Sequence, residues 1–467
     1  MIRIPLFGSM RDLGPAPRFF LLFVAVNVVS WQNIVGPSMV LLARKIGMPE
    51  FFVGMMLSFL PFTSVLMLLT VPWVPRLGPK RVMMWAWGLR NIICCIVFTL
   101  PLALAWGRPQ LSWAVFGTAI LGFCVMRALG AGGWLPWLHE IVPPGQRSAY
   151  FSSETAVTQV INVLIMLAQA ALLAGGDAGI DRFLAIYAIG ILMGFWSLLW
   201  MRRIPGGTAV EGMSAVRFRE EFQTCAAAVR DLSFLKFMLV ASFGISSMCW
   251  FGAANVMYMR DVLLLPDSAT MSINALASLG VLFTVGSWGR FTEQSGSGRA
   301  MFKSLVGHGC AVFIVLLLPV GSPWAGYGMA GVMVLGAVFC AAFNVAANRA
   351  MLNQVPETNR IGYTAVWTVI TALALGITPL LAGAVIGAWG LRGFQVCFVV
   401  SSVWAVLAGM VSLWTVHDSH RTPPTVTAML NPLLPLRTLG RILWITLGLD
   451  ESNTRPSPPP QFPGDRE

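Results

Sequence analysis

Twelve apolar stretches, each of about 20 residues or more, alternate with short polar breaks along this chain. A helix needs about 20 apolar residues to cross the hydrocarbon core of a bilayer, because each residue advances it by only about 1.5 Å. The pattern therefore predicts an all-α polytopic membrane protein with twelve transmembrane helices. The predicted spans are residues 19–43, 51–75, 82–105, 111–138, 155–174, 183–201, 237–259, 269–288, 303–321, 325–350, 363–388 and 393–416.

The longest interior polar segment, residues 202–236, separates the sixth span from the seventh. It is the natural linker between two six-helix halves, residues 19–201 and 237–416. Residues 1–18 form an N-terminal tail. Residues 417–467 form a second tail, in which 431–449 is amphipathic and the Pro-rich end from 452 is predicted to be disordered.

The basic residues predict the orientation. An even number of spans places both termini on one side, and with both inside, 23 Lys and Arg fall on cytoplasmic segments and 6 on external ones. The remaining two, Arg90 and Arg127, lie within spans. Because cytoplasmic loops carry an excess of Lys and Arg, we expect an N-in, C-in protein of the bacterial cytoplasmic (inner) membrane.

Composition excludes several other classes. Hydrophobic residues make up 57% of the chain and charged residues 11%, about half the usual share for a soluble domain. The net charge of +12 would suit nucleic acid, but topology explains basic residues in short loops, so we predict no nucleic-acid partner. The eight cysteines form no Cys-x-x-Cys pair and no His cluster accompanies them, which predicts no metal site and no cofactor.

The pattern Val-Pro-x-x-x-Arg-x-x-Tyr occurs twice, at residues 142–150 and 355–363. All four matched positions are 213 residues apart, which is close to half the chain. The two halves are therefore interpreted as copies of one six-helix unit. Parallel repeats of this kind are typical of a large class of secondary transporters.

Two loops resemble the GxxxDRxGRR signature of the major facilitator superfamily. The loop after the second span keeps Arg76, Gly78 and Lys80, but it has Val71 and Pro75 where the signature has Gly and Asp. The loop after the eighth span has glycines at 289 and 296 and an acidic residue at 293. The resemblance implies a twelve-helix secondary transporter rather than an enzyme.

The repeated pattern also resembles a superfamily element. Glu140-x-x-Pro143-x-x-x-Arg147 is similar to the ExxPxxxR element of its sugar porters, whereas the second copy has Gln354. The resemblance implies an inner gate whose ion pairs form in one conformation and break in the other, although positive-inside anchoring is the simpler alternative. The predicted gating residues are Arg76, Gly78, Lys80, Glu140, Arg147, Glu293, Gly296 and Arg360.

Two arginines within spans must face protein or water, because an unpaired charge at that depth costs several kcal/mol. Arg127 lies in the fourth span, which lines the central cavity in this superfamily, so a cavity or gating role is expected. Gly130 and Gly132 after it loosely resemble the superfamily's RxxQGxG motif. Arg90 lies in the third, peripheral span, where we expect a local structural pair or a side chain that snorkels toward the interface.

Polar and aromatic side chains in the spans predict a substrate site. Asn27 and Trp31 share one face of the first span, and Ser246 and Trp250 share one face of the seventh, at a constant offset of 219 residues. Both tryptophans lie near mid-span and are interpreted as stacking walls for an organic substrate, with helix packing as the alternative. The predicted substrate-binding residues are Asn27, Trp31, Arg127, Gln159, Ser246, Trp250, Asn344 and Asn348.

No Asp or Glu is predicted in the middle of a span, and Glu154 is assigned to the loop after the fourth. Proton symporters of this superfamily often use an intramembrane carboxylate, so simple proton symport is not expected. The predicted function is transport of a small polar or weakly anionic organic solute, sugar-like or glycoside-like, by a monomer in contact with membrane lipids. Export of an amphiphile such as a drug or lysolipid, and a non-transporting receptor or assembly factor, remain alternatives.

Overall fold

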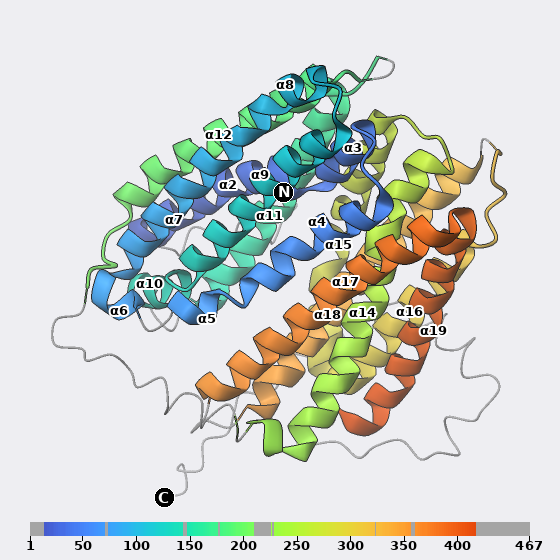
Figure 1. Ribbon diagram of the computed structural model, residues 1–467. Helices are drawn as coiled ribbons and strands as arrows, with labels where there is room; N and C mark the ends of the chain where they lie inside the picture. The colour runs from blue at the N-terminus through green and yellow to red at the C-terminus, as the bar shows by residue number, and fades with distance from the viewer. Residues whose placement is uncertain are drawn as a thin grey trace, which may run out of the picture.

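Long helices running side by side make up the described part of this computed structural model (Figure 1). That part comprises residues 14–70, 73–142, 147–175, 178–209, 226, 228–322, 324–355 and 360–416. The predicted amphipathic segment at 431–449, the Pro-rich end and most of the linker lie outside it.

The first half contains six long helical spans, several of them divided. In order they are α2 (Pro15–Val35) with α3 (Pro37–Lys45), α4 (Glu50–Ser64) with α5 (Met67–Thr70), α7 (Pro79–Cys94) with η1 (Cys95–Thr99) and α8 (Leu100–Ala105), α9 (Pro109–Ala131), α11 (Arg147–Leu172) and α12 (Ile180–Arg203). Two short helices, α6 (Val74–Leu77) and α10 (Trp134–Ile141), lie in the connections.

Within the described ranges, the second half contains six helices. They are α14 (Leu232–Asp261), α15 (Asp267–Ser295), α16 (Ser297–Val315), α17 (Trp324–Gln354), α18 (Arg360–Trp389) and α19 (Leu391–Thr415). Eleven spans among the described residues are long and apolar enough to cross a membrane, and α16 occupies the place of the remaining predicted span. The predicted all-α, twelve-helix layout is confirmed, although α14 begins five residues before the predicted start at 237.

Glycine and proline interrupt or bend several of the spans. The first span breaks at Gly36-Pro37, while Pro61 and Pro379 lie inside α4 and α18. The fourth span is shorter than the predicted 111–138, because α9 ends at Ala131 and α10 begins at Trp134. A Cβ on the intervening Gly133 would lie 2.8 Å from the carbonyl oxygen of Pro79, so α7 packs directly against this break.

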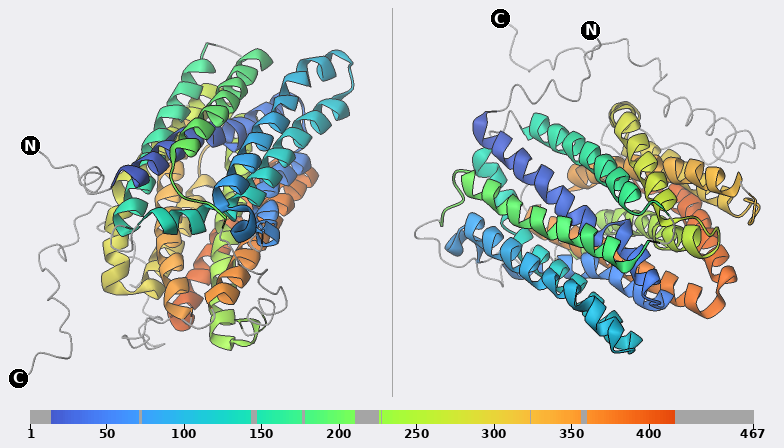
Figure 2. Two further views of the ribbon diagram at one scale, coloured as in Figure 1. Left: turned by 90° about the vertical axis from the view of Figure 1, so that its left-hand side faces the viewer. Right: turned by 90° about the horizontal axis from the view of Figure 1, so that it is seen from above.

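The two halves meet along two helix pairs, α4 with α18 and α11 with α15 (Figures 1 and 2). We call the end where α12 finishes and α14 starts the linker end, and the opposite end the outer end. Near the outer end, a Cβ on Gly54 would clash with the carbonyl oxygen of Pro379, and one on Gly383 would lie 2.5 Å from that of Glu50. Glycine on both helices therefore allows α4 and α18 to close together there.

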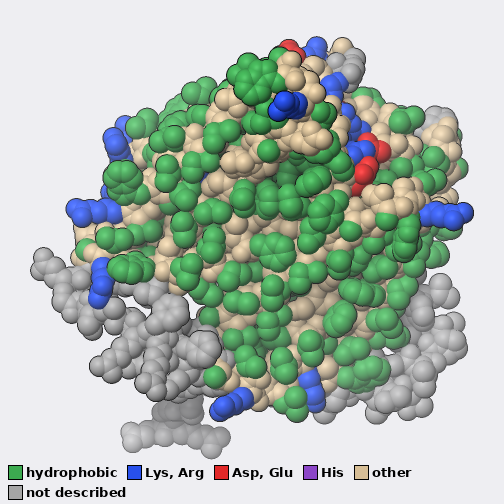
Figure 3. Space-filling model, in the orientation of Figure 1, with side chains coloured by type: hydrophobic (Ala, Val, Ile, Leu, Met, Phe, Trp, Pro, Cys, Tyr) green, Lys and Arg blue, Asp and Glu red, His purple; other side chains and the backbone are tan. Residues whose placement is uncertain are grey.

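The surface is mainly apolar over the long helices. Large side chains such as Phe283, 72% exposed, and Leu192, 64% exposed, point away from the protein. Figure 3 shows hydrophobic side chains across most of the visible face, with Lys and Arg at its margins. Such a surface suits a lipid environment, and the chain is an integral, multi-pass membrane protein.

Candidate functional site

A cavity of about 270 Å³ lies inside the first half, bordered by α2, α7, α9, α10 and α11. We call it the Arg127 cavity. Its polar and aromatic lining consists of Asn27, Arg127, Glu154, Thr158, Phe23, Trp31, Trp87 and Trp134. A small cavity that combines a few polar groups with aromatic walls is the usual form of a binding site for a small organic molecule.

Arg127 lies near the linker end of α9, four residues before the helix ends at Ala131. About 6 Å of helix separates it from that end, much less than the unbroken span 111–138 predicts, because glycines end the helix. No hydrogen bond or ion pair joins its guanidinium to another residue in the described part of the chain. The charge therefore remains available to an anionic group in the cavity.

Glu154 also lines this cavity, which corrects its predicted place in a loop. The helix α11 begins at Arg147 rather than at 155, so Glu154 lies about 10 Å along the helix. Its Oε2 atom is buried and has no hydrogen-bond partner among the described residues. The sequence prediction missed it because residues 147–154 are mostly polar and resemble a loop, although they are helical.

Asn27 connects the cavity to a buried arginine. Its Oδ1 accepts hydrogen bonds from Trp87 Nε1 at 2.8 Å and from Arg90 Nη2 at 2.7 Å. The fully buried Arg90 guanidinium also lies 4.7 Å from the ring centroids of Trp87 and Phe123. Arg90 thus forms a local structural pair, one of the two roles predicted for it. Asn27 lines the cavity and also holds this buried arginine in place.

The other paired residues occupy different surroundings. Trp31 lines the Arg127 cavity, and its buried Nε1 has no hydrogen-bond partner within the described ranges. Trp250 is 6% exposed and contacts Trp404 of α19 edge to face, at 6.4 Å between ring centroids. Ser246 Oγ lies 2.8 Å from Thr378 Oγ1 of α18. In this conformation Ser246 and Trp250 pack between helices of the second half.

The remaining predicted substrate residues do not line the Arg127 cavity. Gln159 of α11 is partly buried, whereas Asn344 and Asn348 are exposed on one face of α17. The Asn344 Nδ2 atom lies 3.6 Å from Cys340 Sγ. Exposed amides in a membrane helix are expected to face water rather than lipid.

Three of the predicted gating residues hold the first part of the linker, residues 204–209, against the first half. Lys80 Nζ donates to the carbonyl oxygens of Ile204 at 2.6 Å and Arg202 at 2.9 Å, and the Gly207 amide donates to Glu140 Oε2 at 2.9 Å. Gly78 has a φ of +83°, and a Cβ there would lie 2.9 Å from the Gly207 carbonyl oxygen. These contacts all lie within one half.

The corresponding turn in the second half has the same backbone form. Gly296 precedes α16 with a φ of +87°, just as Gly78 precedes α7, so the two loop motifs are structural equivalents. Glu293 and Arg76 are both exposed, and Arg76 lies 5.8 Å from the ring centroid of Trp73. The side chains of two further predicted gating residues, at positions 147 and 360, lie outside the described part.

The tyrosines of the repeated pattern make equivalent contacts. Tyr150 of α11 packs edge to face against Phe20 of α2 at 6.2 Å, and Tyr363 of α18 packs against Phe234 of α14 at 4.6 Å. Each tyrosine therefore joins the fifth helix of its half to the first. Tyr363 also donates a hydrogen bond to Asp231 Oδ2 at 2.9 Å.

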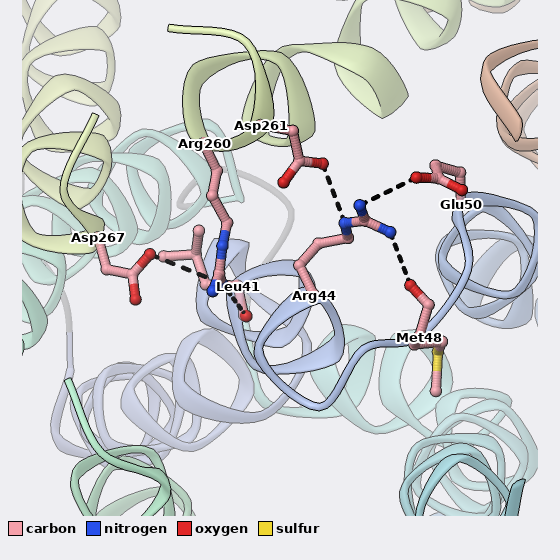
Figure 4. Close-up of polar contacts among 7 residues, drawn as sticks. All are labelled: Leu41, Arg44, Met48, Glu50, Arg260, Asp261 and Asp267. Carbon is pink, nitrogen blue, oxygen red and sulfur yellow. Dashed lines mark hydrogen bonds and ion pairs between the residues drawn. The ribbon is translucent and has the colours of Figure 1, made fainter. Parts of the chain in front are cut away.

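A cluster of charges joins the halves at the outer end (Figure 4). Arg44 lies between Glu50 and Asp261, with an N–O distance of 2.9 Å to each. Arg260 lies 3.7 Å from Asp267 and donates a hydrogen bond to the Leu41 carbonyl oxygen across the halves. We call Arg44, Glu50, Arg260, Asp261 and Asp267 the outer latch.

The outer latch was not predicted from the sequence, although a signal was present. Arg44 and Arg260 are 216 residues apart, and Glu50 and Asp267 are 217 apart, so each half carries an equivalent Arg and acid at its outer end. Arg44–Asp261 adds a bridge between the halves. A contact of this kind stabilises the conformation in which the outer ends are together.

Two similar six-helix halves, a cavity lined by polar and aromatic groups and a charged latch between the halves form the architecture that is typical of secondary transporters of the membrane. The sequence profile of the Major Facilitator Superfamily matches residues 237–449. The matched residues cover the second half of the chain and part of the tail after it.

Solved transporter structures share this fold across most of the chain. A variant of the nucleoside transporter NupG is 14% identical, with a TM-score of 0.67 over 86% of this chain and 100% of that one. An inward-facing bacterial homologue of the iron transporter ferroportin is 17% identical, with a TM-score of 0.65 over 86% and 99%. The human organic anion transporter MFSD10 is 15% identical, with a TM-score of 0.60 over 86% and 100%. No curated protein sequence matches this chain.

Proposed function

We propose that this protein transports a small polar or weakly anionic organic solute by alternating access, and that the Arg127 cavity binds it. The observation that carries the proposal is the Arg127 guanidinium, which has no hydrogen-bond or ion-pair partner among the described residues and faces the same cavity as Trp31 and Asn27. A guanidinium binds carboxylate or phosphate groups, and tryptophan offers a flat face to a ring. A cavity of about 270 Å³ suits a small solute.

Glu154 narrows the class of solute. A carboxylate in the same cavity as Arg127 disfavours a solute with several negative charges but accepts hydrogen bonds from hydroxyl or ammonium groups. The combination favours a solute with one weak anionic group and several donors, such as a sugar acid or a glycoside. Nucleosides and organic anions, named for NupG and MFSD10, are likewise polar organic solutes.

The conformation supports alternating access. The outer latch and the close approach of α4 to α18 hold the outer end together, while the Arg127 cavity lies toward the linker end. The excess of basic residues on linker-side segments favours a cytoplasmic position for that end, and a bacterial inner membrane is the proposed location. The proposed cycle therefore alternates between this state and one in which the latch is broken, with a monomer as the working unit.

A ligand screen followed by transport measurement tests the proposal. Purified protein is heated with sugars, sugar acids, glycosides, nucleosides and other organic acids, since a ligand at about 100 times its Kd adds about 2.7 kcal/mol to apparent stability. A hit should also be taken up by proteoliposomes. Arg127→Ala and Trp31→Ala should abolish both signals, whereas Arg392→Ala, at an exposed position on α19, should keep them. A hit that Arg127→Ala binds equally well would overturn the site.

A second candidate function is export of an amphiphile. The rest of the cavity lining is apolar and includes Val24, Val28 and Met83. Lysolipids and cationic drugs therefore belong in the same screen, and uptake of these alone into inside-out vesicles would favour the exporter. If no solute in the panel is transported, the result would favour a receptor or assembly factor.

A further inference from the structure

A second cavity, of about 510 Å³, opens on the outside of the first half near the linker end. It lies between the end of the second span, α7 and α9, on the opposite side of α7 and α9 from the Arg127 cavity. We call it the Arg81 cavity. Ala86 lines it, whereas the next residue, Trp87, lines the Arg127 cavity. In the same way, Met126 lines the Arg81 cavity, whereas Arg127 lines the other. The two cavities thus share a wall.

The Arg81 cavity combines apolar walls with a cation that has no partner among the described residues. Leu77, Leu89, Met126 and Leu129 supply apolar surface, and none of the lining residues is acidic. The exposed Arg81 guanidinium has no hydrogen bond or ion pair to any residue in the described ranges, in contrast to Lys80 beside it, which is bonded to the linker.

The depth of the cavity corresponds to the headgroup region of a bilayer. Trp85, which lines it, is 80% exposed, and Trp73 nearby in the chain is 55% exposed. Exposed tryptophans gather where hydrocarbon meets headgroups, and basic residues at that level attract anionic lipids. Arg76, exposed between Trp73 and Arg81 in sequence, adds a second positive charge.

We propose that the Arg81 cavity binds one anionic glycerophospholipid from the leaflet on the linker side. Its phosphate lies at Arg81, and an acyl chain lies along Leu89, Met126 and Leu129. Charge complementarity selects an anionic lipid, since a zwitterionic headgroup brings its own cation to the arginine. This lipid site is separate from the proposed substrate site, and it does not depend on which solute is transported.

Native mass spectrometry of the purified protein tests the lipid site. Delipidated protein is titrated with phosphatidylglycerol and, separately, with phosphatidylcholine of the same chain length. We expect one phosphatidylglycerol to bind more tightly than any phosphatidylcholine. Arg81→Gln should weaken that binding roughly fivefold and leave phosphatidylcholine unchanged, because one basic residue near the membrane surface contributes about that factor.

Two further variants make the test specific. Arg299→Gln removes the exposed arginine at the equivalent position of the second half, 218 residues later, and should bind phosphatidylglycerol as the wild type does. Leu129→Trp fills the cavity, keeps Arg81 and should abolish the tight site at unchanged thermal stability. Equal binding of both lipids by the wild type, unchanged binding in Arg81→Gln, or a bound non-lipid amphiphile would each overturn the proposal.

Discussion

At the scale of single residues, Arg127 and Glu154 share one cavity without forming an ion pair. A buried group that gains no compensating partner lowers stability and is commonly retained for function. The free carboxylate oxygen of Glu154 therefore makes this side chain a candidate for contact with substrate.

The first prediction concerns Glu154→Gln. Removing the charge should raise the free energy of unfolding by about 1 kcal/mol, because the buried carboxylate oxygen lacks a hydrogen bond among the described residues. The same change should lower uptake of the identified solute about tenfold, the equivalent of about 1.4 kcal/mol. Thermal unfolding and proteoliposome uptake measure the two effects. Asp181→Asn, at an exposed acid, is the control, and a loss of stability without a loss of transport would contradict the assignment.

The second prediction concerns Asn27, the acceptor for Arg90 and Trp87. Asn27→Ala leaves a buried guanidinium without this bond and should lower the free energy of unfolding by about 3 kcal/mol. Asn27→Asp keeps the acceptor and should retain stability. Thermal unfolding in detergent measures both, with Asn348→Ala at an exposed amide as the control. An Asn27→Ala protein as stable as the control would show that Arg90 finds another partner.

At the scale of helices, the outer latch joins α3 and α4 to α14 and α15. Arg44 is at its centre, because its guanidinium forms ion pairs with Glu50 of its own half and with Asp261 of the other half. Its two acids lie at helix ends, so a small rotation of one half separates them. The latch therefore stabilises the conformation with a closed outer end, while the open conformation stays accessible.

The third prediction is that Arg44→Gln opens the outer end. Spin labels on cysteines replacing the exposed Trp106 and Trp389 should show a second, longer distance population, in a background without native cysteines. Arg108→Gln, at an exposed outer-end arginine, should leave a single distance. An unchanged distribution in Arg44→Gln would mean that helix packing alone closes the outer end.

A steric variant provides an independent check of the same closure. Gly383→Leu places a side chain where even a Cβ would lie 2.5 Å from the Glu50 carbonyl oxygen, so α18 cannot approach α4. It should produce the same longer distance between the spin labels at positions 106 and 389, with the latch residues intact. Gly331→Leu, where a Cβ meets open space, is the matched control.

At the scale of the whole molecule, the duplication visible in the sequence recurs in the structure. Gly78 and Gly296 have the same left-handed conformation, and Tyr150 and Tyr363 make the same contact in their own halves. The two copies have also diverged. All the residues that line the Arg127 cavity belong to the first half. In the second half, Trp250 of α14, the counterpart of α2, packs against Trp404 of α19.

The fourth prediction concerns orientation. With both termini in the cytoplasm, a fluorescent protein fused to the C-terminus should fluoresce, and alkaline phosphatase fused after Arg108, at the outer end, should be active. The reason is the excess of Lys and Arg on linker-side segments. Inactive phosphatase at 108 together with active phosphatase at the C-terminus would reverse the topology.

The sequence by itself determined the class and the layout of this protein. A bilayer requires long apolar helices, so span number and approximate boundaries follow from local composition. The cost of a buried charge likewise predicted that Arg90 would either form a local structural pair or snorkel toward the interface, and the structure shows the pair. The break after Ala131 and the early start of α11 were not predicted. Glycine and polar residues occur in both helices and loops, and the structure packed around them decides which they form.

Only the tertiary structure decided which side chains meet. Asn27 and Arg90 are 63 residues apart, and Arg44 and Asp261 are far further apart in the chain, so no local pattern pairs them. Of the loop charges predicted to form one inner gate, Lys80 and Glu140 bind the linker, whereas Arg76 and Glu293 are exposed. The ion pair between the halves, Arg44–Asp261, lies at the outer end. Hydropathy is a property of each segment alone, whereas a cavity or a latch depends on how distant segments pack, and that is set by side-chain shape across their interfaces.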